Sequence, residues 1–161
     1  MRHMALLRAL AAIAFVCVLA ACTTLPPPTD PPPANTCPIT EPEWLKPPED
    51  AAVLNEPQFG YYIVNADRSM WASAWWTGQA EFPLRATEDG NKVGWFRPAG
   101  ATLEITGKRL DAPSPPMEAH VPCCYPTRFQ SSGLYFPAEG CWEVTARAAE
   151  SELIFVVRVE P

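Results

Sequence analysis

This sequence of 161 residues has few histidines, no phosphate-binding loop and no excess of positive charge. Only His120 follows the N-terminal segment, so Ser-His-Asp or Cys-His catalysis would depend on it alone. No Gly-x-Ser-x-Gly elbow or Gly-rich phosphate loop occurs, and nothing implies a cofactor. The 12 Lys and Arg are outnumbered by 18 Asp and Glu, without a basic patch. We therefore expect neither an enzyme nor a nucleic-acid-binding protein.

Long apolar runs and sustained helical periodicity are also missing after residue 22. The sequence instead contains 6 Trp, 4 Tyr and 7 Phe. So many large rings need a core in which to be buried, which argues against disorder over most of the chain. The length fits one domain of modest size.

The N-terminal segment has the features of an export signal over residues 1–21. Arg2 and Arg8 precede an apolar run over residues 9–21, which is too short to span a bilayer comfortably. The run ends in Leu19-Ala20-Ala21-Cys22, which resembles the lipobox of bacterial lipoproteins. That resemblance implies cleavage after residue 21 and attachment of fatty acyl chains, such as palmitate, to Cys22.

A lipidated Cys22 predicts a protein that is anchored to a membrane of the cell envelope and faces the extracytoplasmic side. Two or three acyl chains give a stable anchor, because each buried CH₂ contributes about 0.8 kcal/mol. Ordinary secretion or an uncleaved N-terminal helix, with Cys22 not lipidated, is the alternative. The partners we expect are the membrane, through the lipid, and another envelope protein, a peptide or a glycan.

Proline dominates the next segment, residues 22–36, which has no aromatic residue. Proline runs favour polyproline II structure, which suits a spacer between the lipid and a folded domain. A proline-rich ligand for an aromatic groove is the alternative. The domain is expected to span residues 37–161, with its first part wrapping the remainder as ordered coil and bringing Trp44 and Leu45 into the core.

From residue 60 the sequence alternates between short apolar runs and turn residues. The runs are rich in Val, Ile, Tyr, Phe, Trp and Thr, which is typical of β-strands. We expect an all-β fold, a sandwich of about seven to nine short strands. Ser131-Ser132-Gly133 is interpreted as a turn.

The last two runs are the clearest predicted element, a hairpin that turns at residues 149–151. Its return strand is apolar at every second position from Leu153 to Val159. Ile154 and Val156 make the first half of the opposite face apolar as well. We therefore expect both faces of this strand to be covered in its first half.

Ahead of this hairpin, residues 137–144 read Pro-Ala-Glu-Gly-Cys-Trp-Glu-Val. This pattern resembles the segment that leads into the penultimate strand of many bacterial immunoglobulin-like domains. The resemblance implies an immunoglobulin-like sandwich in which Gly140 forms a tight corner and Trp142 is a central core residue. With the lipobox and the linker, the chain is similar to uncharacterised bacterial lipoproteins that present a C-terminal domain of this kind, and the fold implies no activity.

Four cysteines follow Cys22 in the sequence: Cys37, Cys123, Cys124 and Cys141. In an oxidising compartment, an even number predicts two disulfides. A bond between the adjacent cysteines would close a strained ring, so separate partners are favoured. We predict Cys37–Cys123 and Cys124–Cys141, only slightly ahead of the exchanged pairing.

A metal site is the alternative for the same stretch of sequence. Met117, His120, Cys123 and Cys124 lie within eight residues and offer thioether, imidazole and thiolate donors, the kind that Cu(I) selects. An exported copper-binding protein is therefore the alternative function. Cysteines in disulfides cannot also be ligands, however, so disulfides are preferred and no metal is predicted.

Six aromatic residues are candidates for a binding surface: Tyr61, Tyr62, Trp71, Trp75, Trp76 and Trp95. Alternation along a strand places Trp71 and Trp75 on one face and Trp76 on the other. Exposed rings beside Arg68 or Arg97 could stack on sugars or hold an extended peptide. The alternative, which the sequence favours, is that these rings form the sandwich core and a face covered by a second copy or by coil, and burial of both Trp75 and Trp76 would support it.

Overall fold

Nine β-strands and no helix make up the part of the chain that the computed structural model describes, residues 37–48, 59–77, 82–123 and 125–161. The predicted signal segment, Cys22 and the linker lie outside these residues. In order, the strands are β1 (Glu43–Leu45), β2 (Gly60–Val64), β3 (Trp71–Ser73), β4 (Asn91–Phe96), β5 (Leu103–Arg109), β6 (Glu118–His120), β7 (Phe129–Tyr135), β8 (Gly140–Ala148) and β9 (Ser151–Val159). A search of the same ranges finds no helix that is long and apolar enough to cross a membrane.

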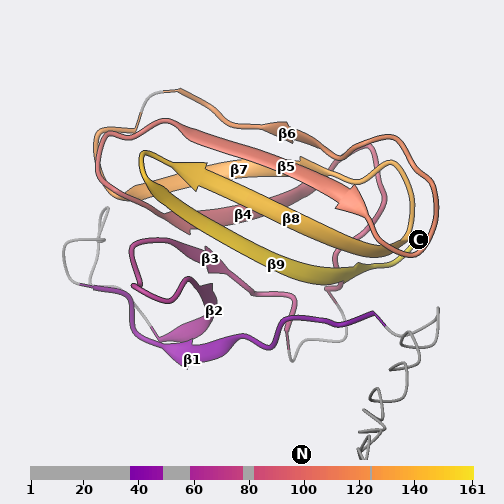
Figure 1. The fold of residues 1–161 in the computed structure, drawn as a ribbon, viewed down its shortest axis with the longest axis horizontal. Coiled ribbons are helices and arrows are strands. Elements are labelled where there is room, and N and C mark those ends of the chain that lie inside the picture. Colours follow the sequence, from indigo (N-terminus) through magenta and orange to yellow (C-terminus); the bar gives the residue numbers. More distant parts are fainter. Residues whose placement is uncertain (1–36, 49–58, 78–81, 124) are drawn as a thin grey trace, which may run out of the picture. The chain divides into compact units, whose positions relative to one another are not determined.

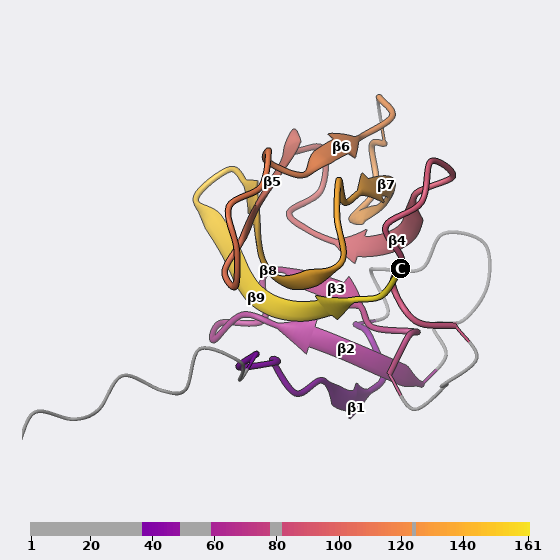
Figure 2. The same ribbon diagram turned by 90° about the vertical axis from the view of Figure 1, so that its right-hand side faces the viewer.

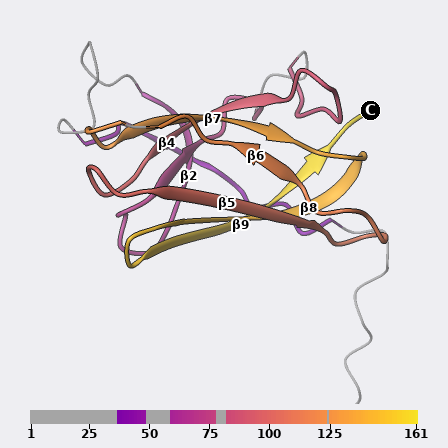
Figure 3. The same ribbon diagram turned by 90° about the horizontal axis from the view of Figure 1, so that it is seen from above.

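The strands form two antiparallel sheets, which confirms the predicted sandwich (Figure 1). One sheet has the order β1-β2-β3-β4-β7-β6, and the other has the order β5-β8-β9. Seen from above, β5, β8 and β9 lie in one layer and β4 and β7 in the other (Figure 3). The order of β3 to β9 is that of a constant-type immunoglobulin domain, with four strands in one sheet and three in the other.

The two ends of the larger sheet differ in how they are completed. At one end, β1 and β2 extend the sheet beyond the seven immunoglobulin-type strands. At the other, β6 lies next to β5 (Figure 2), and Gly107 and Met117 form an antiparallel bridge between the two sheets. This bridge leaves the short strand β6 with a neighbour on each side, which protects an otherwise open sheet edge.

The core lies between the sheets and follows from the alternation of side chains along each strand. Trp95 of β4 meets Phe155 of β9 across the sandwich, with ring centroids 6.1 Å apart. Trp142 is fully buried, its indole nitrogen donates to the carbonyl oxygen of Ala138, and it packs edge-on against Phe136. The predicted role of Trp142 as a central core residue is therefore confirmed.

Gly140 forms the corner that the sequence predicts. Its φ of 132° is one that L side chains rarely adopt. A Cβ at this position would lie 2.6 Å from Nε of Arg109 and 2.8 Å from Oδ1 of Asp111. Only glycine lets the chain enter β8 this close to the Arg109–Asp111 ion pair.

The β8–β9 hairpin is formed as predicted, with Ala148 paired to Ser151. The expectation that both faces of β9 are covered is wrong at Ile154, which is 50% exposed. Val156 is half-buried because Thr40 lies beside it: Thr40 N donates to Val156 O, and Val156 N donates to Thr40 Oγ1, both at 2.9 Å. The segment that covers β9 thus reaches Val156 and leaves Ile154 in solvent.

The segment before β2 does not contribute to the core as expected. Trp44 is 58% exposed and contacts the rings of Tyr61 and Phe59. Leu45 packs instead against Trp71 and Phe96, on the side of the large sheet that faces away from the core. The reason is that residues 43–45 pair with β2 as the edge strand of the larger sheet.

The predicted disulfide pairing is wrong, because Cys37 is bonded to Cys141, with Cα atoms 5.4 Å apart. Cys141 belongs to β8 and lies beside the C-terminal end of β5, where its carbonyl oxygen accepts a hydrogen bond from the main-chain nitrogen of Leu110. Cys123 instead lines a recess with Leu103, at the start of β5. The length of this strand separates the two sites. Cys123 is also disulfide-bonded.

Candidate ligand-binding surface

The outer face of the six-stranded sheet is aromatic where an exposed sheet face is usually polar. Alternation places Val93, Trp95 and the even-numbered residues of β7 in the core. Phe96 and Phe129 therefore point away from the core, together with Tyr62 of β2. The outward positions of three strands thus bring large rings to one surface.

These rings contact one another across the sheet. Tyr62 lies 5.6 Å from Trp71 and 5.9 Å from Phe96, measured between ring centroids. Phe129 continues the row at 5.8 Å from Phe96, and Tyr125 lies 6.3 Å beyond it. Such tilted and edge-to-face pairs hold each ring in one orientation. Trp71 and Phe96 are buried in this cluster of rings, which is separate from the core between the sheets. The side chains of this surface are therefore held in place by their neighbours.

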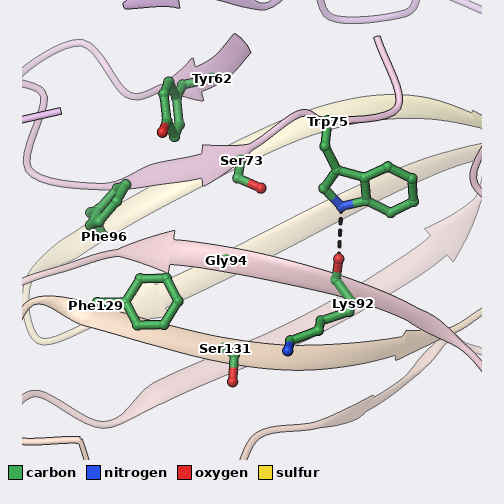
Figure 4. Close-up of a pocket in the computed structure, with 8 residues that line it drawn as sticks. All are labelled: Tyr62, Ser73, Trp75, Lys92, Gly94, Phe96, Phe129 and Ser131. Carbon is green, nitrogen blue, oxygen red and sulfur yellow. Dashed lines mark hydrogen bonds between the residues drawn. The ribbon is translucent and has the colours of Figure 1, made fainter. Parts of the chain in front are cut away.

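A hollow of about 450 Å³ lies beside this row of rings. Figure 4 shows Tyr62, Phe96 and Phe129 on one side, Trp75 on the other, and Gly94 between them. A Cβ on Gly94 would lie 3.2 Å from the Phe129 ring, so the missing side chain creates the floor of the hollow. The volume lies in the range of about 300–1,000 Å³ that is typical of small-molecule sites.

Trp75 is fixed in place although it is 36% exposed. Its indole nitrogen donates to the carbonyl oxygen of Lys92 at 2.7 Å (Figure 4). Trp76 packs edge-on against it, with centroids 5.7 Å apart and an interplanar angle of 83°. The indole therefore presents a flat apolar surface to solvent without an unsatisfied N–H group.

Three polar groups at the hollow are not engaged within the described part of the chain. The hydroxyls of Tyr62 and Ser73 and the ammonium of Lys92 make no hydrogen bond or ion pair there. Burial raises the pKa of Tyr62, so its phenol remains a neutral donor near pH 7. Ser131 differs, because its hydroxyl lies 3.2 Å from that of Tyr125. An apolar hollow with a few free polar groups is suited to binding.

A second hollow, of about 310 Å³, shares Trp75 and Lys92 with the first. Asn91 holds its wall: Oδ1 accepts from the Arg85 main-chain nitrogen, and Nδ2 donates to the carbonyl oxygens of Arg85 and Leu134. The guanidinium of Arg85 donates to a main-chain oxygen of Pro161. The two hollows therefore adjoin at Trp75 and Lys92.

Of the six aromatic residues proposed from the sequence, Tyr62 and Trp75 line the first hollow. Trp71 lies on the same face but is buried beneath its neighbours, and Trp76 packs against the core. The predicted alternation does not extend to Trp75 and Trp76, because β3 ends at Ser73 and both tryptophans lie in the following turn, where their rings contact each other. Burial of both Trp75 and Trp76 does not occur.

The other two aromatic candidates lie elsewhere. Trp95 is fully buried between the sheets, where its indole nitrogen donates to Ser132 Oγ at 2.8 Å. Tyr61 is 40% exposed beside Trp44 at the β1–β2 edge. Neither Trp95 nor Tyr61 is among the described residues that line the hollow.

Neither arginine named as a possible neighbour of the rings reaches the hollow. Arg68 forms an exposed ion pair with Glu43. Arg97 is only 2% exposed and donates to the carbonyl oxygens of Pro98, Thr127 and Tyr125 and to Gln130 Oε1. Burial lowers the pKa of its guanidinium, and these acceptors replace its lost water. Arg97 thus joins the end of β4 to the segment before β7.

Sequence reasoning missed Lys92, Gly94, Phe129 and Ser131. The predicted turn at residues 131–133 is wrong, because these residues form the middle of β7. Small polar residues resembled a turn, but strand pairing with β4 uses their main-chain groups. The outward alternation of residues 92, 94 and 96 was a usable signal, since it marks one side of a strand.

Among the proposed copper donors, Met117, His120 and Cys123 do not converge, and Cys124 lies outside the described residues. Met117 is buried in the core against Gly107, whereas His120, three residues later, is exposed on the other side of β6. Cys123 is a disulfide cysteine. Over the ranges that the structure describes, no group of three or more His, Cys, Asp or Glu residues is placed to hold a metal ion.

The site must therefore be judged on its own geometry. No protein-family model, curated protein or solved structure matches this chain.

Proposed function

We propose that this protein is a lipid-anchored binding protein of the bacterial cell envelope, and that its ligand occupies the hollow beside Trp75. The single observation that carries the binding role is the rigid, ring-lined hollow of about 450 Å³ on the outer sheet face. A sheet face that only meets water has no need of fixed aromatic rings beside an unfilled glycine position.

The anchor is supported by the sequence. The run Leu19-Ala20-Ala21-Cys22 follows an apolar segment of signal length, and a proline-rich spacer follows it. A disulfide within the domain, between Cys37 and Cys141, is in keeping with an oxidising compartment outside the cytosol. The spacer would hold the binding face away from the lipid surface.

The anchor is tested by membrane fractionation and intact mass. The Cys22→Ser variant should lose the acyl mass and leave the membrane fraction, whereas Cys17→Ser, within the predicted signal, should behave as wild type. Continued acylation of Cys22→Ser would contradict the assignment of the lipid to this residue.

The binding role is tested by calorimetry with neutral oligosaccharides, acidic oligosaccharides and peptides, using purified protein in a non-ionic detergent without a sugar headgroup. At least one class should bind, and Trp75→Ala should weaken it by about tenfold, since ring contacts of this kind contribute on the order of 1 kcal/mol or more. Trp44→Ala, an exposed indole away from the hollow, is the matched control. Equal binding by both variants would refute a site at Trp75.

A further inference from the structure

Main-chain groups are not what the hollow offers to a ligand. Strand β4 pairs with β3 on one side and with β7 on the other, and β7 pairs in turn with β6. Of these pairings, only that between β4 and β7 runs the length of the hollow, but main-chain groups lie in the plane of a sheet, so a ligand that rests on its face meets side chains first. A ligand on this face is recognised by side chains alone.

The side chains available combine flat rings with hydroxyl groups. Trp75 and Phe129 present apolar ring surface on opposite sides of Gly94 (Figure 4). Tyr62 and Ser73, which carry hydroxyl groups, line the same hollow. Sugar rings have the complementary character, because C–H groups on their faces pack on aromatic rings while hydroxyls at their edges form hydrogen bonds.

The charge at the surface is opposite to that of the chain as a whole. The chain has a formal net charge of −6, yet the charged side chains lining the two hollows, within the described residues, are Lys92 and Arg85. Arg85 is directed to a main-chain oxygen of Pro161, whereas the ammonium of Lys92 is not engaged in that part of the chain. A local cation on an acidic protein favours an anionic group in the ligand.

The size of the surface indicates more than one sugar ring. Hollows of about 450 Å³ and 310 Å³ are both lined by Trp75 and Lys92. A chain of sugars could place one ring in each hollow, with both rings near Trp75 and a carboxylate at Lys92. From these observations we infer that the ligand is a carboxylate-bearing saccharide chain, such as a uronic acid oligomer. This inference rests on the proposed binding function and names its ligand class.

The test is calorimetry of the full-length protein with tetragalacturonate and with its methyl ester, which keeps the sugar rings but removes the charge. The acid should bind at least about tenfold more tightly than the ester, because a charge-assisted hydrogen bond is about twice as strong as a neutral one. Added salt should weaken binding of the acid and leave binding of the ester unchanged. A hexaglutamate peptide serves as the probe for acidic peptides.

Three variants assign the binding to the hollow. Lys92→Gln should remove most of the preference for the acid, and Lys108→Gln, an exposed lysine on the other sheet, is its control. Gly94→Val should abolish binding of both sugars by filling the floor of the hollow. Near-UV circular dichroism tests whether Gly94→Val is folded. Because Lys92 is exposed, Lys92→Gln should fold as wild type does and stays informative if Gly94→Val does not fold.

The outcomes separate the two proposals. Equal binding of acid and ester, or an unchanged preference in Lys92→Gln, would overturn the acidic-saccharide inference. Binding of hexaglutamate alone, lost in Gly94→Val, would overturn it too, but would leave the proposed binding function in place. If no probe class binds, both proposals are wrong.

Discussion

Removal of the Cys37–Cys141 disulfide is expected to cost a large part of the stability of the domain. The bond closes a loop with a sequence separation of 104 residues. In the chain-entropy model, a loop of this length restricts the unfolded chain enough to contribute about 4.7 kcal/mol at 25 °C. Domains are stable by only about 5–15 kcal/mol in total. The double variant Cys37→Ala/Cys141→Ala should therefore be folded but marginal.

The folded state of this variant should change little. Thr40 still bonds Val156 in both directions, and this interaction holds the N-terminal segment on β9 without the covalent link. The buried Cys141 is replaced by a slightly smaller side chain, so the added cavity is small. The loss is thus expected to arise from the unfolded chain rather than from broken contacts.

The assay is urea unfolding under non-reducing conditions, followed by tryptophan fluorescence. With an m-value of about 2 kcal/mol/M, the midpoint should fall by about 2 M urea. Ile39→Ala, an exposed residue of the same segment, is the control for local packing and should shift the midpoint little. A loss below about 1 kcal/mol in the double variant would refute the entropy argument.

Two further predictions concern charged side chains. Asp111 accepts hydrogen bonds from Arg109 Nε and the Cys141 main-chain nitrogen, which outweigh the opposing effect of burial and lower its pKa below the ordinary value of 3.8. Wild type should therefore be more stable than Asp111→Asn above pH 4, and the difference should vanish as the pH falls through the folded-state pKa; a difference constant from pH 2 to 7 in urea unfolding would contradict this. Arg97→Met should destabilise the fold by about 1–3 kcal/mol, because it leaves the buried Gln130 Oε1 and the partly buried carbonyl oxygens of Pro98 and Tyr125 without this donor. Thermal unfolding measures this loss, and a variant as stable as wild type would show that water satisfies those oxygens.

Local patterns were sufficient for the strands and for part of the core. The alternation from Leu153 to Val159 predicted one buried face of β9, and Gly140 and Trp142 occupy the corner and core positions expected of them. Strand alternation is a local property, so a single segment reveals it. Coverage by other segments is not local, which is why Ile154 was predicted to be covered and is exposed.

The disulfide shows the same limit. The sequence identified Cys37 and Cys141 as disulfide cysteines, but their pairing depends on which end of β5 each segment reaches. The argument that a bond between the adjacent Cys123 and Cys124 would be strained does not say which end of β5 each cysteine reaches. Only the path of the chain along β9, held by Thr40, brings Cys37 to the start of β8.

The sequence by itself determined an all-β domain, its last hairpin and a set of aromatic residues able to form a surface. The tertiary structure decided which of these rings meet. Trp75 faces Phe129 across Gly94 because the turn after β3 is hydrogen-bonded to Lys92 of β4, and β4 pairs with β7, a segment far away in the chain. A strand's period of two tells which residues share a side, but the neighbours across a sheet are set by register and strand order, which no single segment encodes.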